Sequence, residues 1–282
     1  MIIDSHQHFW NYNPVRDVWI DKSMEVIKKD FLPKDLKPIL IQNGVDGCVA
    51  IQADQSEEET KFLLACAEKN SFIKGVVGWV DLTSKDVDKR LAYYASNSKF
   101  KGVRHVAQAE KDDYLIRNDV QNGISKLAKY NLTYDILIFP QQLPAALALV
   151  EKFPEQKFIL DHIAKPNISE PMNDKWKVNI KALSKFENVS CKLSGMVTET
   201  KDFNFVDEDF EPYMNHIFSS FGTNRILFGS DWPVCLLATD YKKVITLINN
   251  YLDIYSAKIK AKVLGVNAVS YTHLTLPTIL RV

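Results

Sequence analysis

Short apolar strands alternate with amphipathic helices along most of this chain, and this alternation limits the possible folds. Counting from Ile2, the pattern predicts eight strands, most of them continuous runs rich in Val and Ile. Such runs are typical of parallel strands that are buried on both faces. Eight β/α units favour a closed (β/α)8 barrel of the TIM type, whose active site lies at the carboxyl ends of the strands. A doubly wound open sheet is the alternative, although no G-x-G-x-x-G or phosphate-binding loop follows any predicted strand.

The predicted elements follow one another at regular spacing. After the opening strand, the predicted strands are residues 45–52, 73–80, 100–106, 132–138, 157–162, 189–193 and 225–231. The predicted helices are residues 57–69, 86–94, 120–129, 144–153, 178–186, 210–221 and 241–251. The segment 11–37 is polar and aromatic without a clear period, so we expect a loop or a small lid over the end of the first strand.

The first predicted strand ends with two histidines, His6 and His8. Side chains alternate along a strand, so both imidazoles point the same way, with Cα atoms about 6–7 Å apart. They can therefore converge on one metal ion or on one substrate oxygen. Asp4 has the same parity, and we expect it one step deeper on the same face.

Polar side chains also occupy the ends of the other predicted strands, and four of the six histidines lie at such ends. The set comprises Gln52, Asp54, Trp79, Asp81, Arg104, His105, Asp135, Asp161, His162, Lys165, Lys192, Ser194, Ser230, Asp231 and Trp232. With the first-strand pair, His162 and Asp231 can hold one divalent ion with an open position. They can equally act without metal, as hydrogen-bond donors and a general base. Either arrangement suits water activation and stabilisation of an oxyanion at a carbonyl.

The composition argues against some classes of binding partner. Lys and Arg together number 35 and so do Asp and Glu, which gives zero net charge and argues against a nucleic-acid or anionic-membrane partner. No apolar run approaches the roughly 20 residues of a membrane span. The four cysteines form no C-x-x-C pair and are expected to be buried free thiols. We therefore expect a soluble, cytoplasmic protein.

Five motifs occur in order along the chain. They are His6-Gln7-His8-Phe9-Trp10, Gly102-Val103-Arg104-His105, Asp161-His162-Ile163-Ala164-Lys165-Pro166, Cys191-Lys192-Leu193-Ser194-Gly195 and Phe228-Gly229-Ser230-Asp231-Trp232-Pro233. Together they resemble the amidohydrolase superfamily and, within it, the amidohydrolase-2 branch with its sugar lactonases of the L-fuconolactonase and L-rhamnonolactonase type. The resemblance runs from residue 1 to about Ala268.

The resemblance implies a distorted (β/α)8 barrel over residues 1–268 that hydrolyses a sugar lactone to its aldonic acid. It implies that His6, His8, His162 and Asp231 are the catalytic residues, with Asp231 deprotonating the attacking water. The same four would be the ligands if one divalent ion, zinc or manganese, is bound. Similar lactonases work without metal, so no cofactor is the alternative.

A dinuclear site is not expected. The fifth predicted strand carries Asp135 where many relatives have histidine, and the fourth shows no bridging lysine.

Five further residues are predicted to bind the substrate. Arg104, His105 and Lys192 are candidates for the sugar hydroxyls and the product carboxylate, although Arg104 and Lys192 could instead form a structural ion pair inside the barrel. Trp10 and Trp79 either stack on the sugar or pack at the rim of the barrel. The expected partner is a small sugar lactone, and the expected state is a monomer or homodimer.

The chain departs from the family after Ala268. Residues 269–282 are rich in β-branched residues, contain Pro277 and resemble a translated sequencing adapter. We expect them to be a non-native tail in place of the closing C-terminal helix.

Two other functions compete with the lactonase. One is a metal-dependent decarboxylase of a small aromatic or unsaturated acid, which would use the same histidines and aspartate. The other is an inactive barrel that only binds a sugar acid.

Overall fold

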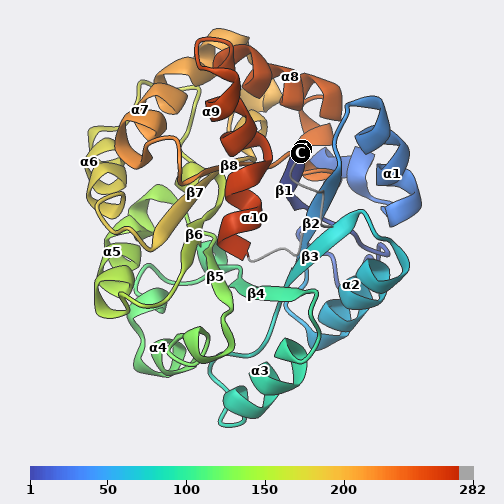
Figure 1. Ribbon diagram of the computed structural model, residues 1–282, viewed down its shortest axis with the longest axis vertical. Helices are drawn as coiled ribbons and strands as arrows, with labels where there is room; N and C mark the ends of the chain where they lie inside the picture. Colours follow the sequence, from blue (N-terminus) through green and yellow to red (C-terminus); the bar gives the residue numbers. More distant parts are fainter. Residues whose placement is uncertain (273–282) are drawn as a thin grey trace, which may run out of the picture.

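A computed structural model describes residues 1–272 and shows eight parallel strands in sequence order, β1 to β8, around one barrel (Figure 1). The barrel is nearly closed where β1 meets β8. There Gln7 forms a parallel bridge with Trp232, and the amide of Asp231 donates to the carbonyl of His6 at 2.8 Å. The predicted (β/α)8 barrel is therefore confirmed, and the open doubly wound sheet is excluded.

The strands are short, and the helices surround them (Figure 1). The strands are β1 Ile3–Gln7, β2 Gly47–Ile51, β3 Ile73–Gly78, β4 Phe100–His105, β5 Thr133–Ile136, β6 Phe158–Leu160, β7 Val189–Leu193 and β8 Ile226–Phe228. The helices are α1 Pro33–Gln42, α2 Glu57–Lys69, α3 Val87–Ala95, α4 Asn118–Ile124, α5 Leu143–Lys152, α6 Asp174–Leu183, α7 Glu211–Phe221, α8 Tyr241–Leu252, α9 Ala257–Ala261 and α10 Asn267–Thr272.

Helix α1 begins inside the segment that we expected to be a loop. Pro33 occupies the first turn, where no amide donor is needed, and the Asp35 carboxylate accepts the amide of Leu32 at 2.9 Å. Leu36 and Leu40, one turn apart, bury one face of the helix. The loop prediction was therefore wrong from Pro33 onward.

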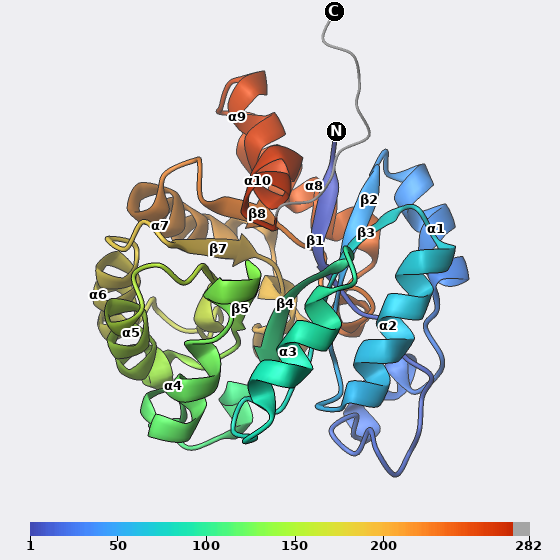
Figure 2. The same ribbon diagram turned by 60° about the horizontal axis from the view of Figure 1, so that its bottom comes forward.

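The interior of the barrel divides into an apolar layer and a charged layer. The apolar layer, at the end where the chain starts, consists of Ile3, Val49, Ile51, Val77, Leu227 and Ala268. Ala268 belongs to α10, which lies beside the amino terminus and closes this end (Figure 2). Function is therefore confined to the opposite, carboxyl end of the strands.

Helix α10 crosses the boundary that we predicted after Ala268. Its span includes residues 269–272, so the structure shows no break at the start of the expected non-native tail. Residues 273–282 lie outside the described part of the chain. The non-native origin of the segment stays a prediction.

A β-bulge in β1 changes the direction of Asp4. The pairing of β1 with β2 shifts register between Asp4 and Gln7. Asp4 consequently accepts bonds from the amide and hydroxyl of Ser230, at 2.9 and 2.6 Å, and from the Tyr241 hydroxyl of α8 at 3.0 Å. The prediction that Asp4 shares the face of the two histidines was wrong, because one extra residue reverses the alternation.

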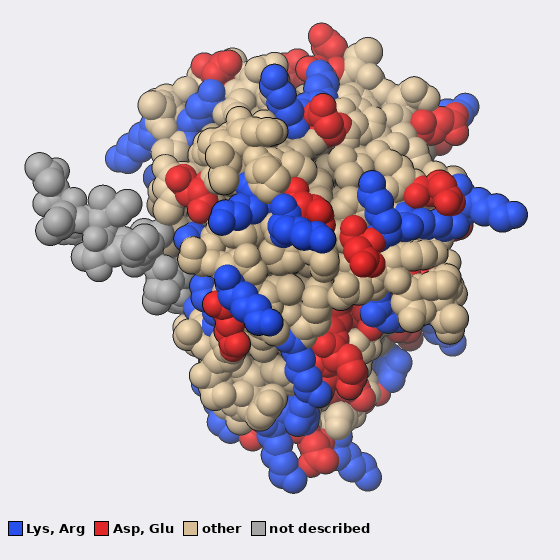
Figure 3. Space-filling model, turned by 90° about the vertical axis from the view of Figure 1, so that its right-hand side faces the viewer, with Lys and Arg blue, Asp and Glu red and all other residues tan. Residues whose placement is uncertain are grey.

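The surface carries charges of both signs. Figure 3 shows lysine and arginine side chains intermixed with aspartate and glutamate on one face of the molecule. None of the helices within residues 1–272 is long and apolar enough to cross a membrane. Cys48, Cys191 and Cys235 are buried and Cys66 is half-buried, all as free thiols.

Candidate active site

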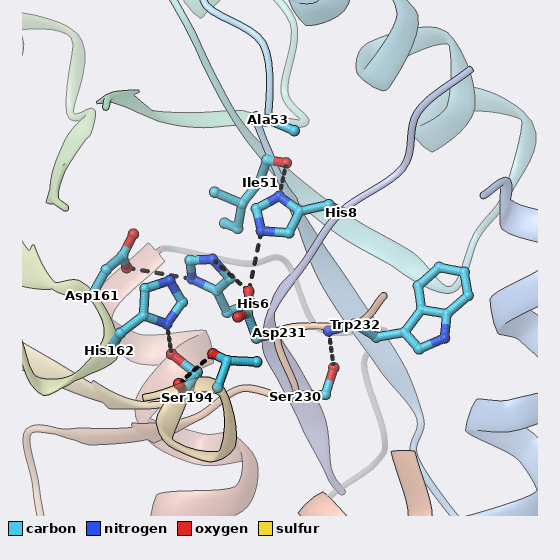
Figure 4. Close-up of polar contacts among 12 residues, drawn as sticks. His6, His8, Ile51, Ala53, Asp161, His162, Ser194, Ser230, Asp231 and Trp232 are labelled. Carbon is cyan, nitrogen blue, oxygen red and sulfur yellow. Dashed lines mark hydrogen bonds and ion pairs between the residues drawn. The ribbon is translucent and has the colours of Figure 1, made fainter. Parts of the chain in front are cut away.

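His6 and His8 converge on Asp231 at the carboxyl end of the barrel (Figure 4). Their rings lie 5.0 Å apart, and their Nε2 atoms lie 3.7 and 3.3 Å from Asp231 Oδ1. All three side chains are buried. Burial alone would raise the pKa of Asp231, but the surrounding His162, His8 and His6 hold it well below the usual range. The Asp231 carboxylate is therefore ionised at neutral pH.

The hydrogen bonds of His8 indicate a cation between its ring and Asp231. Nδ1 of His8 lies 2.9 Å from the carbonyl of Ile51, so it must carry the proton that is donated there. In a neutral ring, Nε2 then points a lone pair at Asp231 Oδ1. Two acceptors that face each other at 3.3 Å need a cation between them, either a proton or a metal ion. This donor set is one that suits zinc.

The four predicted ligands do not form one group. They fall into two overlapping groups, the second of which also includes Asp161. The ligand atoms of His6, His8 and Asp231 lie within 4.8 Å of one another, and those of His6, Asp161 and His162 form a second such group. The first group fits one metal ion. Among the described residues, the ring nitrogens of His162 do not belong to the first group.

His162 lies on a left-handed turn that follows β6. Residues His162, Ile163, Ala164 and Lys165 have φ between 50° and 61°. The left-handed conformation costs an L-residue about 1–2 kcal/mol, and such strain persists where the surrounding structure enforces it, commonly at functional sites. Here the Trp176 Nε1–H donates to the carbonyl of Ile163 at 2.9 Å. Predicted strand 157–162 therefore ends early, at Leu160.

The His162 imidazole is neutral and held by Ser194. Its Nδ1 lies 2.9 Å from Ser194 Oγ, and its ring lies 4.4 Å from that of His6. Burial lowers the pKa of His162 to about 4, although Asp231 and Asp161 act in the opposite direction. Neutral His162 can therefore donate or accept a hydrogen bond at a substrate carbonyl.

Gly195 leaves room for the site. It has φ +63°, and a Cβ atom there would lie 2.5 Å from Nδ1 of His162 and 3.2 Å from Asp231 Oδ2. Both the backbone and the space exclude a side chain at this position.

A cluster of buried charges lies behind His6. Lys192 Nζ bonds to Asp135 and lies 3.0 Å from Asp161 Oδ1, while Arg104 Nη1 lies 3.2 Å from Asp161 Oδ2. Asp161 Oδ1 is also 3.4 Å from Nδ1 of His6. Burial would lower the pKa of Lys192, but Asp135 and Asp161 raise it above the usual value. The cluster therefore orients the His6 ring through contacts at its Nδ1 atom.

Our predicted set of site residues omitted four residues that contact it. Asp135, Asp161 and Gln52 of the buried cluster, and Ser194 beside His162, appeared in the sequence as polar strand ends, and that position was the available signal. Gln52 accepts the Arg104 Nε–H at 2.7 Å and so orients the guanidinium.

His8, His162 and Asp231 line a cavity of about 350 Å³, the size of a small-molecule site, and His6 is fully buried beside them. The polar residues that line it are His8, Asp54, Gln55, Arg104, Gln108, His162, Lys165 and Asp231. The less polar residues that line it are Trp10, Trp19, Ala53, Val106, Ala109, Leu137 and Val234. A ligand with both hydroxyl and alkyl surface would match this mixed lining.

Three predicted substrate-binding residues do not line this cavity in the described structure. Lys192 lies in the buried cluster, as the structural ion-pair alternative anticipated. Trp79 donates its Nε1–H to Nδ1 of His105 at 3.1 Å, and His105 stacks on Tyr114 with ring centroids 4.6 Å apart. These two belong to the packing of the rim.

Trp10 and Arg104 do line the cavity. Trp10 also packs at the rim, because its Nε1–H donates to the carbonyl of Lys29 and its ring lies 5.5 Å from that of Phe31. Trp19, which we did not predict, meets Trp10 edge to face at 5.9 Å and is 42% exposed.

A buried glutamate shapes the loop after β2. Glu59 of α2 accepts the amides of Ala53 and Asp54 at 2.8–3.1 Å, and these two residues line the cavity. Burial raises the pKa of Glu59 to about 8, although the two amides and Arg104 counteract this shift. The loop geometry thus depends on a buried titratable group.

The chain is similar to known proteins over nearly its whole length. A family profile described as amidohydrolase matches residues 3–270. The chain is 35% identical over 281 residues to an L-fucono-1,5-lactonase of Burkholderia ambifaria, covering 98% of this chain and 97% of the relative. An L-fucono-1,5-lactonase of Burkholderia multivorans is 35% identical over 266 residues, covering 89% and 88% of the two chains.

A crystal structure of an amidohydrolase from Burkholderia multivorans with bound zinc superposes with a TM-score of 0.94 at 33% identity, covering 98% of this chain and 100% of the other. A (β/α)8 barrel with histidines and an aspartate at its strand ends defines a barrel of the amidohydrolase type. The chain belongs to the amidohydrolase family.

Proposed function

We propose that this protein hydrolyses a sugar lactone of the L-fucono-1,5-lactone type to its aldonic acid. The observation that carries the proposal is the arrangement of His6, His8 and His162 around Asp231, with His8, His162 and Asp231 lining one cavity. The 35% identity to two L-fucono-1,5-lactonases supports the substrate class. A 6-deoxy sugar lactone carries both hydroxyl groups and one methyl group, which suits a cavity lined by both polar and apolar side chains.

In the proposed mechanism, Asp231 acts as the general base. Its ionised carboxylate accepts a proton from water, and the water oxygen attacks the lactone carbonyl. His162 donates a hydrogen bond to the carbonyl oxygen as negative charge develops there, since Ser194 can donate to Nδ1 and leave the proton on Nε2. The carbon–oxygen bond of the ring then breaks, and the proton held by Asp231 passes to the departing ring oxygen.

We propose His6, His8 and Asp231 as ligands of one divalent metal ion, with His162 beside it. A bound ion would lower the pKa of water and polarise the carbonyl. The acceptor pair of His8 and Asp231 supports the proposal, as does the bound zinc in the relative of known structure. Asp161 and Lys192 orient His6 in either case, with or without the ion.

The experiment that tests this function is acid release, followed with a pH indicator, from a panel of aldonolactones. The panel includes L-fucono- and L-rhamnono-lactone, each with and without a chelator. Release from L-fucono-1,5-lactone is expected. Loss with the chelator and recovery with a divalent ion would assign His6, His8 and Asp231 as ligands, while persistence would assign them to direct contact with the substrate. Folded protein that releases acid from no lactone would contradict the proposal.

A further inference from the structure

Lys165 reaches the catalytic cavity through the geometry of the left-handed turn. The amide of Lys165 donates to the carbonyl of His162 at 2.7 Å, which closes a turn of the 3₁₀ type. Such a turn has three residues, so side chains three apart lie on the same side. Both His162 and Lys165 accordingly line the cavity, as Asp231 does.

The left-handed backbone therefore positions a second side chain, that of Lys165, besides that of His162. Ile163 and Ala164, between the two cavity residues, are fully buried. In an extended segment, side chains three apart would instead point to opposite faces. The turn thus brings a neutral hydrogen-bonding group and a basic side chain to the lining of the same cavity.

In the described part of the chain, two basic side chains other than histidines line the cavity, those of Arg104 and Lys165. The two differ in the groups that they contact. Arg104 directs its N–H groups to Gln52 and Asp161, and its Nη1 also lies 3.3 Å from Nε2 of His6. Lys165 Nζ pairs with Glu199 Oε1 at 3.1 Å and lies 5.6 Å from the centre of the Phe139 ring. An ammonium group has three N–H donors, and this pair needs one.

The reaction proposed above turns a neutral lactone into an anion. A cation among the residues that line the same cavity is favourable for the charge that develops on the carbonyl oxygen and for the product carboxylate. Resting on that proposed function, we infer that Lys165 is a substrate-binding residue whose ammonium group contacts the carboxyl oxygens of the aldonate. Glu199 is its competing partner and holds the ammonium group when no anion is present.

The test measures L-fuconate binding by calorimetry, alongside turnover of L-fucono-1,5-lactone, in three variants. Lys165→Met is expected to bind L-fuconate at least tenfold more weakly and to lose kcat about 100-fold, as for removal of one oxyanion donor. Glu199→Gln removes the competing carboxylate and is expected to bind L-fuconate several-fold more tightly. Lys201→Met is the matched control, because Lys201 lines the neighbouring outer pocket and not the cavity.

Folded Lys165→Met with the affinity and kcat of the unmodified protein would overturn the inference. If Lys165→Met does not fold, Glu199→Gln provides the test. Unchanged or weaker binding of L-fuconate by Glu199→Gln would also overturn the inference. Unmodified protein that binds L-fuconate in a Lys165-dependent way but hydrolyses no lactone would support the anion site and contradict the proposed function. Unmodified protein that does not bind L-fuconate would refute the inference, even where turnover is normal.

Discussion

Replacement of Gly195 with alanine is predicted to damage activity far more than stability. The new Cβ atom would lie 2.5 Å from Nδ1 of His162, whereas ordinary van der Waals contacts begin at 3.4 Å, so the imidazole must move by about 0.9 Å. A misplacement of roughly 1 Å at a reacting group costs on the order of 100-fold in rate. That loss corresponds to about 2.7 kcal/mol of transition-state stabilisation. The φ of +63° adds about 1–2 kcal/mol of backbone strain.

Gly44 provides the matched control for this prediction. It has φ +66°, it directly follows the C-cap residue of α1, and nothing lies within 4 Å of its Cβ position. Gly44→Ala should therefore lose a similar free energy of unfolding in urea but retain full kcat/KM for lactone hydrolysis. Gly195→Ala should lose about 100-fold in kcat/KM. Equal kcat/KM values in the two variants would refute the argument that Gly195 makes room for His162.

Three further predictions concern groups around the cavity. Lys192→Met leaves the buried Asp135 carboxylate without its ion-pair partner and leaves Asp161 with Arg104 as its remaining basic partner. It should lower the free energy of unfolding by about 3–5 kcal/mol in urea titrations, against no change for Lys201→Met. The pKa of Glu59 in the folded protein, about 8, exceeds the ordinary glutamate value of 4.5, so the folded state holds the extra proton between these values. Stability should fall as pH rises from about 5 to 8, by at most about 1.4 kcal/mol per pH unit, and Glu59→Gln should remove that slope in urea titrations across this range. Ser194→Ala removes the partner of His162 Nδ1 and should reduce kcat about 10-fold or more, and an unchanged rate would exclude Ser194 from orienting the ring.

The periodic part of the fold was predictable from the sequence because burial imposes it. Continuous apolar runs predicted all eight strands, and α2 was predicted at its observed bounds, Glu57–Lys69. The ends of β6 and β8 were not predictable in the same way. Ile163 and Ala164 have no local preference for positive φ, and the turn exists because Trp176 and the surrounding core hold it.

The histidine–aspartate centre was predictable because each member lies at or just after the end of a strand, and the carboxyl ends of barrel strands meet at one face. The contacts between individual polar residues were not predictable from the sequence. Arg104 is in register with Asp135 on the neighbouring strand, yet its ion pair is with Asp161. The bulge that turns Asp4 away likewise depends on pairing between strands, which the alternation of residue types does not reveal.

The most direct test of the central claim compares the unmodified protein with Asp231→Asn in the hydrolysis of L-fucono-1,5-lactone. Asparagine keeps the shape of the side chain but cannot accept the proton of the attacking water. The account predicts that kcat falls by about 100-fold or more in a variant that remains folded. Turnover close to that of the unmodified protein would contradict the role of Asp231 as the general base and, with it, the mechanism proposed for this site.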